Sequence, residues 1–152
     1  MSCCSSVFTP QVQKKLSRVY VDIIPERSGE LLRSSLQRML CSSECPQDYT
    51  LEINMETSER ALEMGEDAKI TLMHVVLKAF FTLKHCHKSI YQGQAVAYYY
   101  RALTPSFYGQ TSTQFYISQE GAQQLAHQIF LKLGNFFSRT KKLQQNSTKS
   151  LR

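Results

Sequence analysis

The chain has 152 residues, of which 42% are apolar, and a net charge of +6 at neutral pH. This is enough for one domain with a hydrophobic core and too little for two domains of ordinary size. Residues 139–152 contain five basic residues and no acid, so the rest of the chain carries a net charge of only +1. A nonspecific nucleic-acid binder needs a basic face on its folded part, and the charge distribution therefore argues against that class.

The N-terminal segment, residues 1–17, is rich in Ser, Gln and Lys and contains Pro10, which predicts a tether without regular structure. It lacks the apolar core of a signal peptide, and no run in the chain approaches the about 20 apolar residues of a membrane-spanning helix. Read literally, this start predicts a cytoplasmic protein. The odd number of cysteines, five, fits free thiols inside a cell or a lipidated cysteine outside it, and the first residues equally fit a trimmed precursor.

The first half of the chain predicts a strand, a helix and a second strand. Apolar and polar residues alternate over 19–23, before Pro25 ends the strand. Ser28 is a good helix cap, and the helix should continue to about Leu40, well before Pro46. Alternation resumes over Tyr49–Met55, which predicts a strand with one buried face.

The second half predicts two longer strands, Ile70–Leu83 and Ile90–Leu103, and a final helix that begins at Ser118. The residues of one helix face recur at spacings of three and four: Ala122, Leu125, Ala126, Ile129, Phe130, Leu133, Phe136 and Phe137. Such a helix needs a flat apolar partner, which the strands supply most economically as an antiparallel sheet.

The order strand, helix, three strands, helix predicts an α+β fold, a four-stranded mostly antiparallel sheet with two helices packed on one face. We expect one domain over residues 18–138, preceded by the tether over 1–17 and followed by a basic disordered tail over 139–152. The strand over Ile70–Leu83 is apolar on both faces. Because the helices can cover only one of them, the other face should serve a second partner.

The best metal candidate combines Cys41, Cys45, His85, Cys86 and His87. In a hairpin the start of one strand lies beside the end of the next, and period two would place both histidines on one face, so a Cys2His2 zinc set is conceivable. A disulfide, Cys45–Cys86 or Cys41–Cys45, fits an oxidising compartment. Free thiols with surface histidines are the favoured interpretation.

No group of residues predicts catalysis or a cofactor. His74 and His127 fit structural or interface positions better than those of catalytic bases, and the chain has no glycine-rich phosphate loop. The aromatic run Tyr98 to Tyr100 is ordinary strand composition, with successive rings on opposite faces. We therefore expect a protein that is not an enzyme and binds no cofactor.

Several stretches, in this order and spacing, resemble one known family. They are Cys4 with Phe8-Thr9-Pro10, Val21-Asp22-Ile23 through Arg27 to Leu36, Tyr49-x-Leu51, Ala68-Lys69-Ile70-x-Leu72, Ser106-Phe107-Tyr108, Phe115, and the helix from Ala122 to Phe137. In these features the chain resembles the lipopolysaccharide-assembly lipoproteins, the LptE-like family, especially their alphaproteobacterial branch. The likeness covers nearly all of residues 4–138.

The resemblance implies a protein held to the periplasmic side of the outer membrane by a lipid on Cys4, or alternatively on Cys3. It would plug a large lipopolysaccharide-transport β-barrel, help to assemble it, and aid insertion of lipopolysaccharide into the outer leaflet. Arg60, Lys69 and Arg101 would pair with lipid phosphates, and ordinary surface ion pairing is the alternative for these three residues. The residues expected to face the barrel are Ile70, Leu72, His74, Val76, Phe80, Tyr98 and Tyr100.

The main alternative is a small cytoplasmic RNA-binding module, because the order helix, three strands, helix and the basic tail also suit double-stranded-RNA-binding domains. Against it, the final helix opens with Gln119-Glu120-Gly121 where lysines would be needed. A generic ligand-binding lipoprotein is a third possibility, which differs from the first only in its partner.

Overall fold

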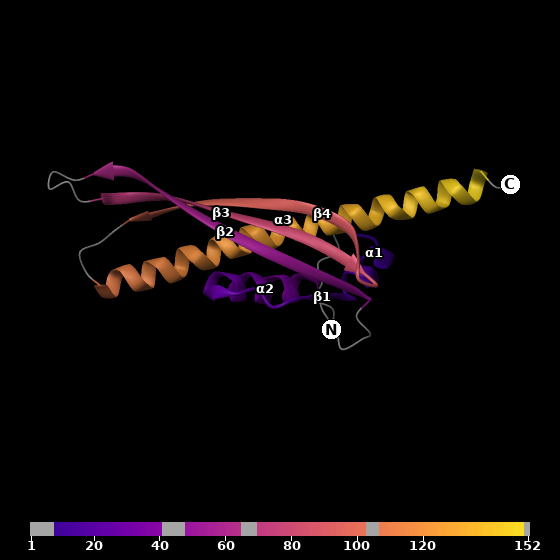
Figure 1. Cartoon of the computed structure of the whole chain (residues 1–152), viewed down its shortest axis with the longest axis horizontal. Coiled ribbons are helices and arrows are strands. Elements are labelled where there is room, and N and C mark those ends of the chain that lie inside the picture. The colour runs from indigo at the N-terminus through magenta and orange to yellow at the C-terminus, as the bar shows by residue number, and fades with distance from the viewer. Residues whose placement is uncertain (1–7, 41–47, 65–69, 103–106, 151–152) are drawn as a thin grey trace.

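The chain folds into a four-stranded mixed sheet with helices on one face (Figure 1). The computed structural model describes residues 8–40, 48–64, 70–102 and 107–150. Its elements are α1 (Pro10–Leu16), β1 (Val19–Val21), α2 (Glu26–Leu40), β2 (Tyr49–Met64), β3 (Ile70–His85), β4 (Lys88–Ala102) and α3 (Phe107–Ser150). The strands follow one another in chain order across the sheet, β1 parallel to β2 and the other pairs antiparallel. This confirms the predicted α+β class.

The core lies between the sheet and helices α2 and α3. Alternate residues of β3 point into it, from Val75 through Leu77, Ala79 and Phe81 to Leu83, and all are buried. The predicted face of α3 is buried against them, apart from Phe136, which is partly buried. On β4 the core-facing residues Ala95 and Ala97 are small. The periodicities of both elements are therefore confirmed.

The turn between β3 and β4 consists of Cys86 and His87, whose φ angles are 52° and 65°. Two positive φ values are typical of the tight two-residue hairpin turns that match the twist of the flanking strands. His85 therefore ends β3 and pairs with Lys88, while His87 lies in the turn. The prediction that both histidines occupy one face of a strand is wrong for this reason.

The N-terminal segment contains a helix where the sequence predicted an irregular tether. Pro10 lies at the start of α1, where its missing N–H costs no hydrogen bond. Val12 and Leu16, one helical turn apart, are both buried. The prediction for residues 1–17 is thus wrong for 10–16, because two apolar residues are enough to fix a short helix on an existing core.

β2 and α3 are much longer than predicted, while α2, β3 and β4 differ from their predicted bounds by only one or two residues. β2 continues from Met55 to Met64, and α3 begins at Phe107 instead of Ser118. α3 also remains helical to Ser150, where a disordered tail was expected. It runs the length of the elongated molecule, and its C-terminal part extends past the β3–β4 turn (Figure 1). We call the end with this turn and α1 proximal, and the end where β2 stops and β3 starts distal.

The outer edge of β4 is occupied by side chains of α3. Gln128 accepts a hydrogen bond from the Val96 backbone N–H (3.1 Å) and donates one to the Val96 carbonyl (2.7 Å). Lys132 Nζ donates to the carbonyl of Gln94. An amide side chain thus replaces the missing neighbouring strand, which protects this edge from pairing with other chains. Among the described helices, none has the length and apolar content required to cross a membrane.

Candidate partner-binding face

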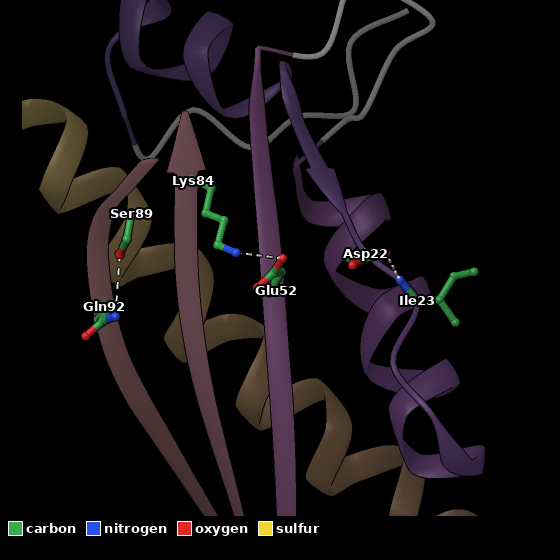
Figure 2. Close-up of polar contacts among 6 residues, drawn as sticks. All are labelled: Asp22, Ile23, Glu52, Lys84, Ser89 and Gln92. Carbon is green, nitrogen blue, oxygen red and sulfur yellow. Dashed lines mark hydrogen bonds and ion pairs between the residues drawn. The ribbon is translucent and has the colours of Figure 1, made fainter. Parts of the chain in front are cut away.

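The sheet has one face that none of the described helices covers. This side carries the side chains at even positions of β2, from Glu52 to Arg60, and those at the even positions of β3 and β4. We call it the open face. Figure 2 looks onto its proximal half, with α3 passing behind the strands. The strands thus separate a sealed core from a surface that remains available for binding.

Aromatic side chains gather at the distal part of the open face. Tyr98 and Tyr100 on β4 are 58% and 59% exposed. His74 lies beside them on β3, and its ring is stacked on that of Tyr98 with a centroid distance of 5.8 Å and an interplanar angle of 9°. The His74 and Tyr100 rings are 5.1 Å apart. These contacts fix the three rings relative to one another while leaving the tyrosine faces exposed.

Aliphatic residues complete this surface. Leu72 and Val76 flank His74 on the same side of β3 and are half-buried. We call Leu72, His74, Val76, Tyr98 and Tyr100 the distal patch. Phe80, farther along β3 on the same face, is 39% exposed. A row of exposed and half-buried rings on a sheet face is typical of a surface that packs against a partner.

On the proximal half of the open face, polar side chains contact one another across and along the strands (Figure 2). Lys84 and Glu52 form an ion pair across β3 and β2, with Nζ and Oε1 3.0 Å apart. Gln92 donates to the Ser89 hydroxyl at 3.4 Å on β4. The exposed aromatic rings of the open face, by contrast, lie in its central and distal regions.

All the described residues that the sequence predicted for a barrel interface lie on this one face. The prediction included Ile70, which starts β3 but whose side chain lies outside the described part of the structure. The strand register brings the others together, since His74 lies opposite Tyr100 and Val76 opposite Tyr98. The grouping is an observation, whereas the barrel-facing role stays a prediction.

Two of the three basic residues predicted to bind lipid phosphates are described, and they lie on opposite faces of the sheet. Arg60 is exposed on the open face, opposite His74. Arg101 lies opposite Met73, on the helix side, where its guanidinium forms an ion pair with Glu59 at 3.3 Å. The third residue, Lys69, is outside the described residues.

The Arg101 side chain is only 20% exposed, and its Nε is buried without a hydrogen-bond partner among the described residues. The ion pair with Glu59 was not foreseen from the sequence. Only the strand register, which places β2 and β4 on either side of β3, brings the two residues together. Of the two described basic residues, Arg60 is therefore the one available to an anionic ligand.

The remaining predicted sites are only partly within the described structure. Cys3 and Cys4, the alternative lipid anchors, and Cys41 and Cys45, the proposed metal or disulfide partners, lie outside it. Cys86 is a free, exposed thiol in the hairpin turn. Within the described ranges no three His, Cys, Asp or Glu side chains come close enough to hold a metal ion.

At the proximal end, Tyr49 links three elements. Its ring is 5.0 Å from that of His85 and 5.1 Å from that of Phe137 on α3, measured between centroids. Burial and the negative charge of Asp48 raise the pKa of the Tyr49 hydroxyl above its ordinary value, opposed by Arg18. Arg18 itself pairs with Asp48 at 3.0 Å. This cluster secures the end of the sheet nearest the N-terminal segment.

Several solved structures with a similar fold are described as bacterial lipoproteins. A candidate lipoprotein from Caulobacter crescentus CB15 superposes with a TM-score of 0.72 at 17% identity, covering 86% of this chain and 97% of that one. The rare lipoprotein B from Shewanella oneidensis superposes with a TM-score of 0.62 at 10% sequence identity, covering 81% of this chain and 98% of that one. A minor lipoprotein from Acinetobacter baumannii superposes with a TM-score of 0.61 at 15% sequence identity, covering 77% of this chain and 90% of that one. No protein-family model and no curated protein sequence matches the chain.

Proposed function

We propose that this protein is a lipid-anchored component of the outer membrane that assists a lipopolysaccharide-transport β-barrel by occupying its interior, without catalytic activity. Its fold is similar to those of lipoproteins from three Gram-negative organisms over nearly their whole length. The sequence motifs that resemble lipopolysaccharide-assembly lipoproteins point to the same class. In this proposal, the lipid is carried by Cys4 or Cys3, and the body lies on the periplasmic side.

The observation that carries the proposal is the uncovered distal patch. Tyrosine and histidine present an apolar ring together with a polar group, and they pack well against surfaces of mixed character. The interior of an outer-membrane barrel is such a surface, because lumen-facing side chains are mostly polar while the wall is rigid. Tyr98 and Tyr100, more than half exposed and held by His74, are the expected anchors.

Arg60 is the residue we propose for contact with lipopolysaccharide. It is exposed, lies beside the distal patch, and has no ion pair among the described residues. A guanidinium can bind a phosphate through two parallel hydrogen bonds. Arg101 is less suited because its guanidinium already forms an ion pair with Glu59.

The test is co-purification from a Gram-negative host that expresses the chain behind a lipoprotein signal peptide. We expect one large barrel protein to be recovered from the detergent-solubilised outer membrane. Replacing Tyr98 and Tyr100 by serine should lower its recovery severalfold. The matched control replaces Gln92 and Gln94, exposed residues of the same strand and face outside the distal patch, and should leave recovery unchanged.

The proposal fails if no membrane protein co-purifies, or if the control variant loses the barrel as completely as the tyrosine variant. Retention of RNA by the chain expressed without a signal peptide, with release by salt, would favour the cytoplasmic RNA-binding alternative. That outcome would overturn the outer-membrane proposal.

A further inference from the structure

The two edges of the sheet differ in what covers them. Gln128 and Lys132 of α3 bind the backbone of the β4 edge. On the opposite side, β1 pairs with β2 only over Tyr49 to Leu51, and β2 then continues to Met64. Most of β2 is therefore an edge strand without a neighbour on that side in the part of the chain described here.

Backbone hydrogen bonds show which residues of β2 point their polar groups toward this edge. Tyr49 donates to the Arg18 carbonyl, and the Leu51 carbonyl accepts from Asp22, so odd-numbered residues face the β1 side. Because backbone direction alternates along a strand, Met55, Thr57, Glu59 and Ala61 face the same way beyond the end of β1. No hydrogen bond among the described residues reaches their outward N–H and C=O groups. The register shift that follows Ala61 ends this regular stretch.

The side chains along this stretch are also uncovered. Every residue from Glu56 to Leu62 is exposed, on both faces of the strand. Neither a helix nor a loop of the described chain therefore blocks approach to the edge in the plane of the sheet. A long exposed edge with unpaired backbone groups is the usual site for addition of another strand.

The charges along β2 indicate which strand fits. Glu56 and Arg60 lie on the open face, two positions on either side of Ser58. If a second copy pairs antiparallel with Ser58 opposite its own equivalent, each Glu56 faces an Arg60. The odd-numbered residues then meet as hydrogen-bonded pairs, Thr57 with Glu59 and Met55 with Ala61, as the backbone directions require.

Neighbouring registers are less favourable. Moving the two-fold axis from Ser58 to Glu56, to Glu59 or to Arg60 places a like charge opposite itself, which destabilises cross-strand pairs. An axis at Thr57 produces no ion pair across the axis, since Glu56 then meets Ser58. The sequence of β2 is thus complementary to itself in one register.

We propose that two copies of this chain associate through antiparallel pairing of their β2 edges about Ser58, which joins the two sheets into one continuous sheet. The interface is isologous, as expected for a homodimer with two-fold symmetry. Both open faces then lie on the same side. This association goes beyond the proposed function and does not depend on it, because it needs neither the lipid nor the barrel. It uses Arg60, so contact of Arg60 with lipopolysaccharide requires the dimer to separate.

The first test exchanges the charges on the full, unlipidated chain and follows its mass by sedimentation equilibrium. The wild-type chain should show a concentration-dependent dimer. Glu56→Arg alone or Arg60→Glu alone places like charges opposite each other twice, and should weaken dimerisation by about tenfold or more. The double variant E56R/R60E should restore it.

Mixing the two single variants is the most specific form of this test. Glu56 also lies opposite Lys78 on β3, so a charge change there has an effect within one chain as well. That internal effect is the same whether a variant is alone or mixed. A dimer that forms between E56R and R60E chains, but poorly within either, therefore reports pairing between copies.

A cysteine at position 58 tests the register. Opposite residues of a non-hydrogen-bonded antiparallel pair have Cα atoms about 4.5 Å apart, within the about 4.4–6.8 Å range of disulfides. Ser58→Cys should form covalent dimers under mild oxidation. The matched control Asn54→Cys, on the same face of β2 but away from the axis, should form few, as should the wild-type chain with its native cysteines.

The proposal is overturned if the chain remains monomeric at the highest soluble concentration. It is also overturned if a dimer forms whose strength ignores the charge exchange, or if position 58 cross-links no faster than position 54. Circular dichroism of each variant shows whether a loss of dimer reflects unfolding. In that case the Ser58→Cys cross-linking test, which leaves Glu56 and Arg60 unchanged, decides.

Discussion

Gly134 is the point at which the N-terminal segment fits onto the last helix. A Cβ atom at this position would lie 2.1 Å from Cζ of Phe8, and two other atoms of that ring would be within 2.6 Å. The Phe8 ring also packs edge-on against Phe130, with centroids 5.5 Å apart. The absence of a side chain at 134 therefore provides the space that holds Phe8 against α3.

Gly134→Ala should destabilise the protein by about 1 kcal/mol, although alanine is the better helix former by about 1 kcal/mol. The reason is that the new methyl group displaces Phe8. In a Phe8→Ala background the same change should instead stabilise by roughly 0.5–1 kcal/mol. Urea unfolding of the four proteins of this cycle measures both effects. Equal effects in the two backgrounds would show that Phe8 does not occupy this space.

Tyr49 makes the stability dependent on pH at the alkaline end. Its pKa is raised in the folded state, so folding opposes loss of the phenolic proton. The stabilisation by the protonated form is complete below the ordinary tyrosine pKa of about 10 and is lost as the pH rises above it. The difference in free energy of unfolding between wild type and Tyr49→Phe should therefore be constant at neutral pH. Above about pH 10 the wild type should lose stability relative to Tyr49→Phe. Parallel pH curves from urea unfolding would contradict this assignment.

At the scale of elements, α3 acts on β4 through a side chain that imitates a strand. Gln128→Leu removes both hydrogen bonds to Val96 and should destabilise the protein by about 1–3 kcal/mol, since two backbone groups lose their partner. Gln128→Glu is the matched variant, because a carboxylate can still accept from the Val96 N–H but cannot donate to its carbonyl. Its free energy of unfolding in urea should lie between those of the wild type and Gln128→Leu.

Amide hydrogen exchange distinguishes this explanation from a general loss of packing. In Gln128→Leu the Val96 N–H should exchange faster than in wild type, whereas in Gln128→Glu it should stay protected. Equal exchange in the two variants would show that the amide does not cap the edge.

The sequence predicted those elements whose pattern is set by burial on one side. On β3 every second residue from Val75 to Leu83 is apolar and buried because the helices cover that face, and the face of α3 is regular because the sheet covers it. The distal half of β2 was missed because its side chains are exposed on both faces, so no alternation marks it. Backbone pairing with β3 makes it a strand. α1 was missed because its two buried residues, Val12 and Leu16, gain their burial only from the assembled core.

The candidate site was predictable to the same extent. Period two assigns His74 and Val76 to one face of β3, and Tyr98 and Tyr100 to one face of β4, and both assignments agree with the structure. Which rings touch depends on the register between the strands, which the sequence does not determine when both strands are long and apolar. The separation of Arg101 from the open face follows from period two alone, because Arg101 is the neighbour of Tyr100 on β4.

The layering of the whole molecule predicts opposite sensitivities for neighbouring residues of β3. Leu77 is 2% exposed beneath α3, while Val76 is half-buried on the open face. Leu77→Ala should destabilise by about 2–5 kcal/mol because it leaves a cavity. Val76→Ala should cost less than about 1 kcal/mol, and thermal unfolding of both variants measures the difference. Equal losses would mean that the open face is covered by something other than water.

The position of α3 after the four described strands in the chain has a consequence for biosynthesis. The sheet cannot close its core until residues such as Leu125, Ile129 and Leu133 have emerged, because these supply the opposite wall. Until then a nascent or translocating chain exposes the apolar side of β3 together with an unpaired β2 edge. Binding of chaperones to the chain should therefore be strongest just before α3 has emerged, and it should fall abruptly when α3 docks onto the sheet.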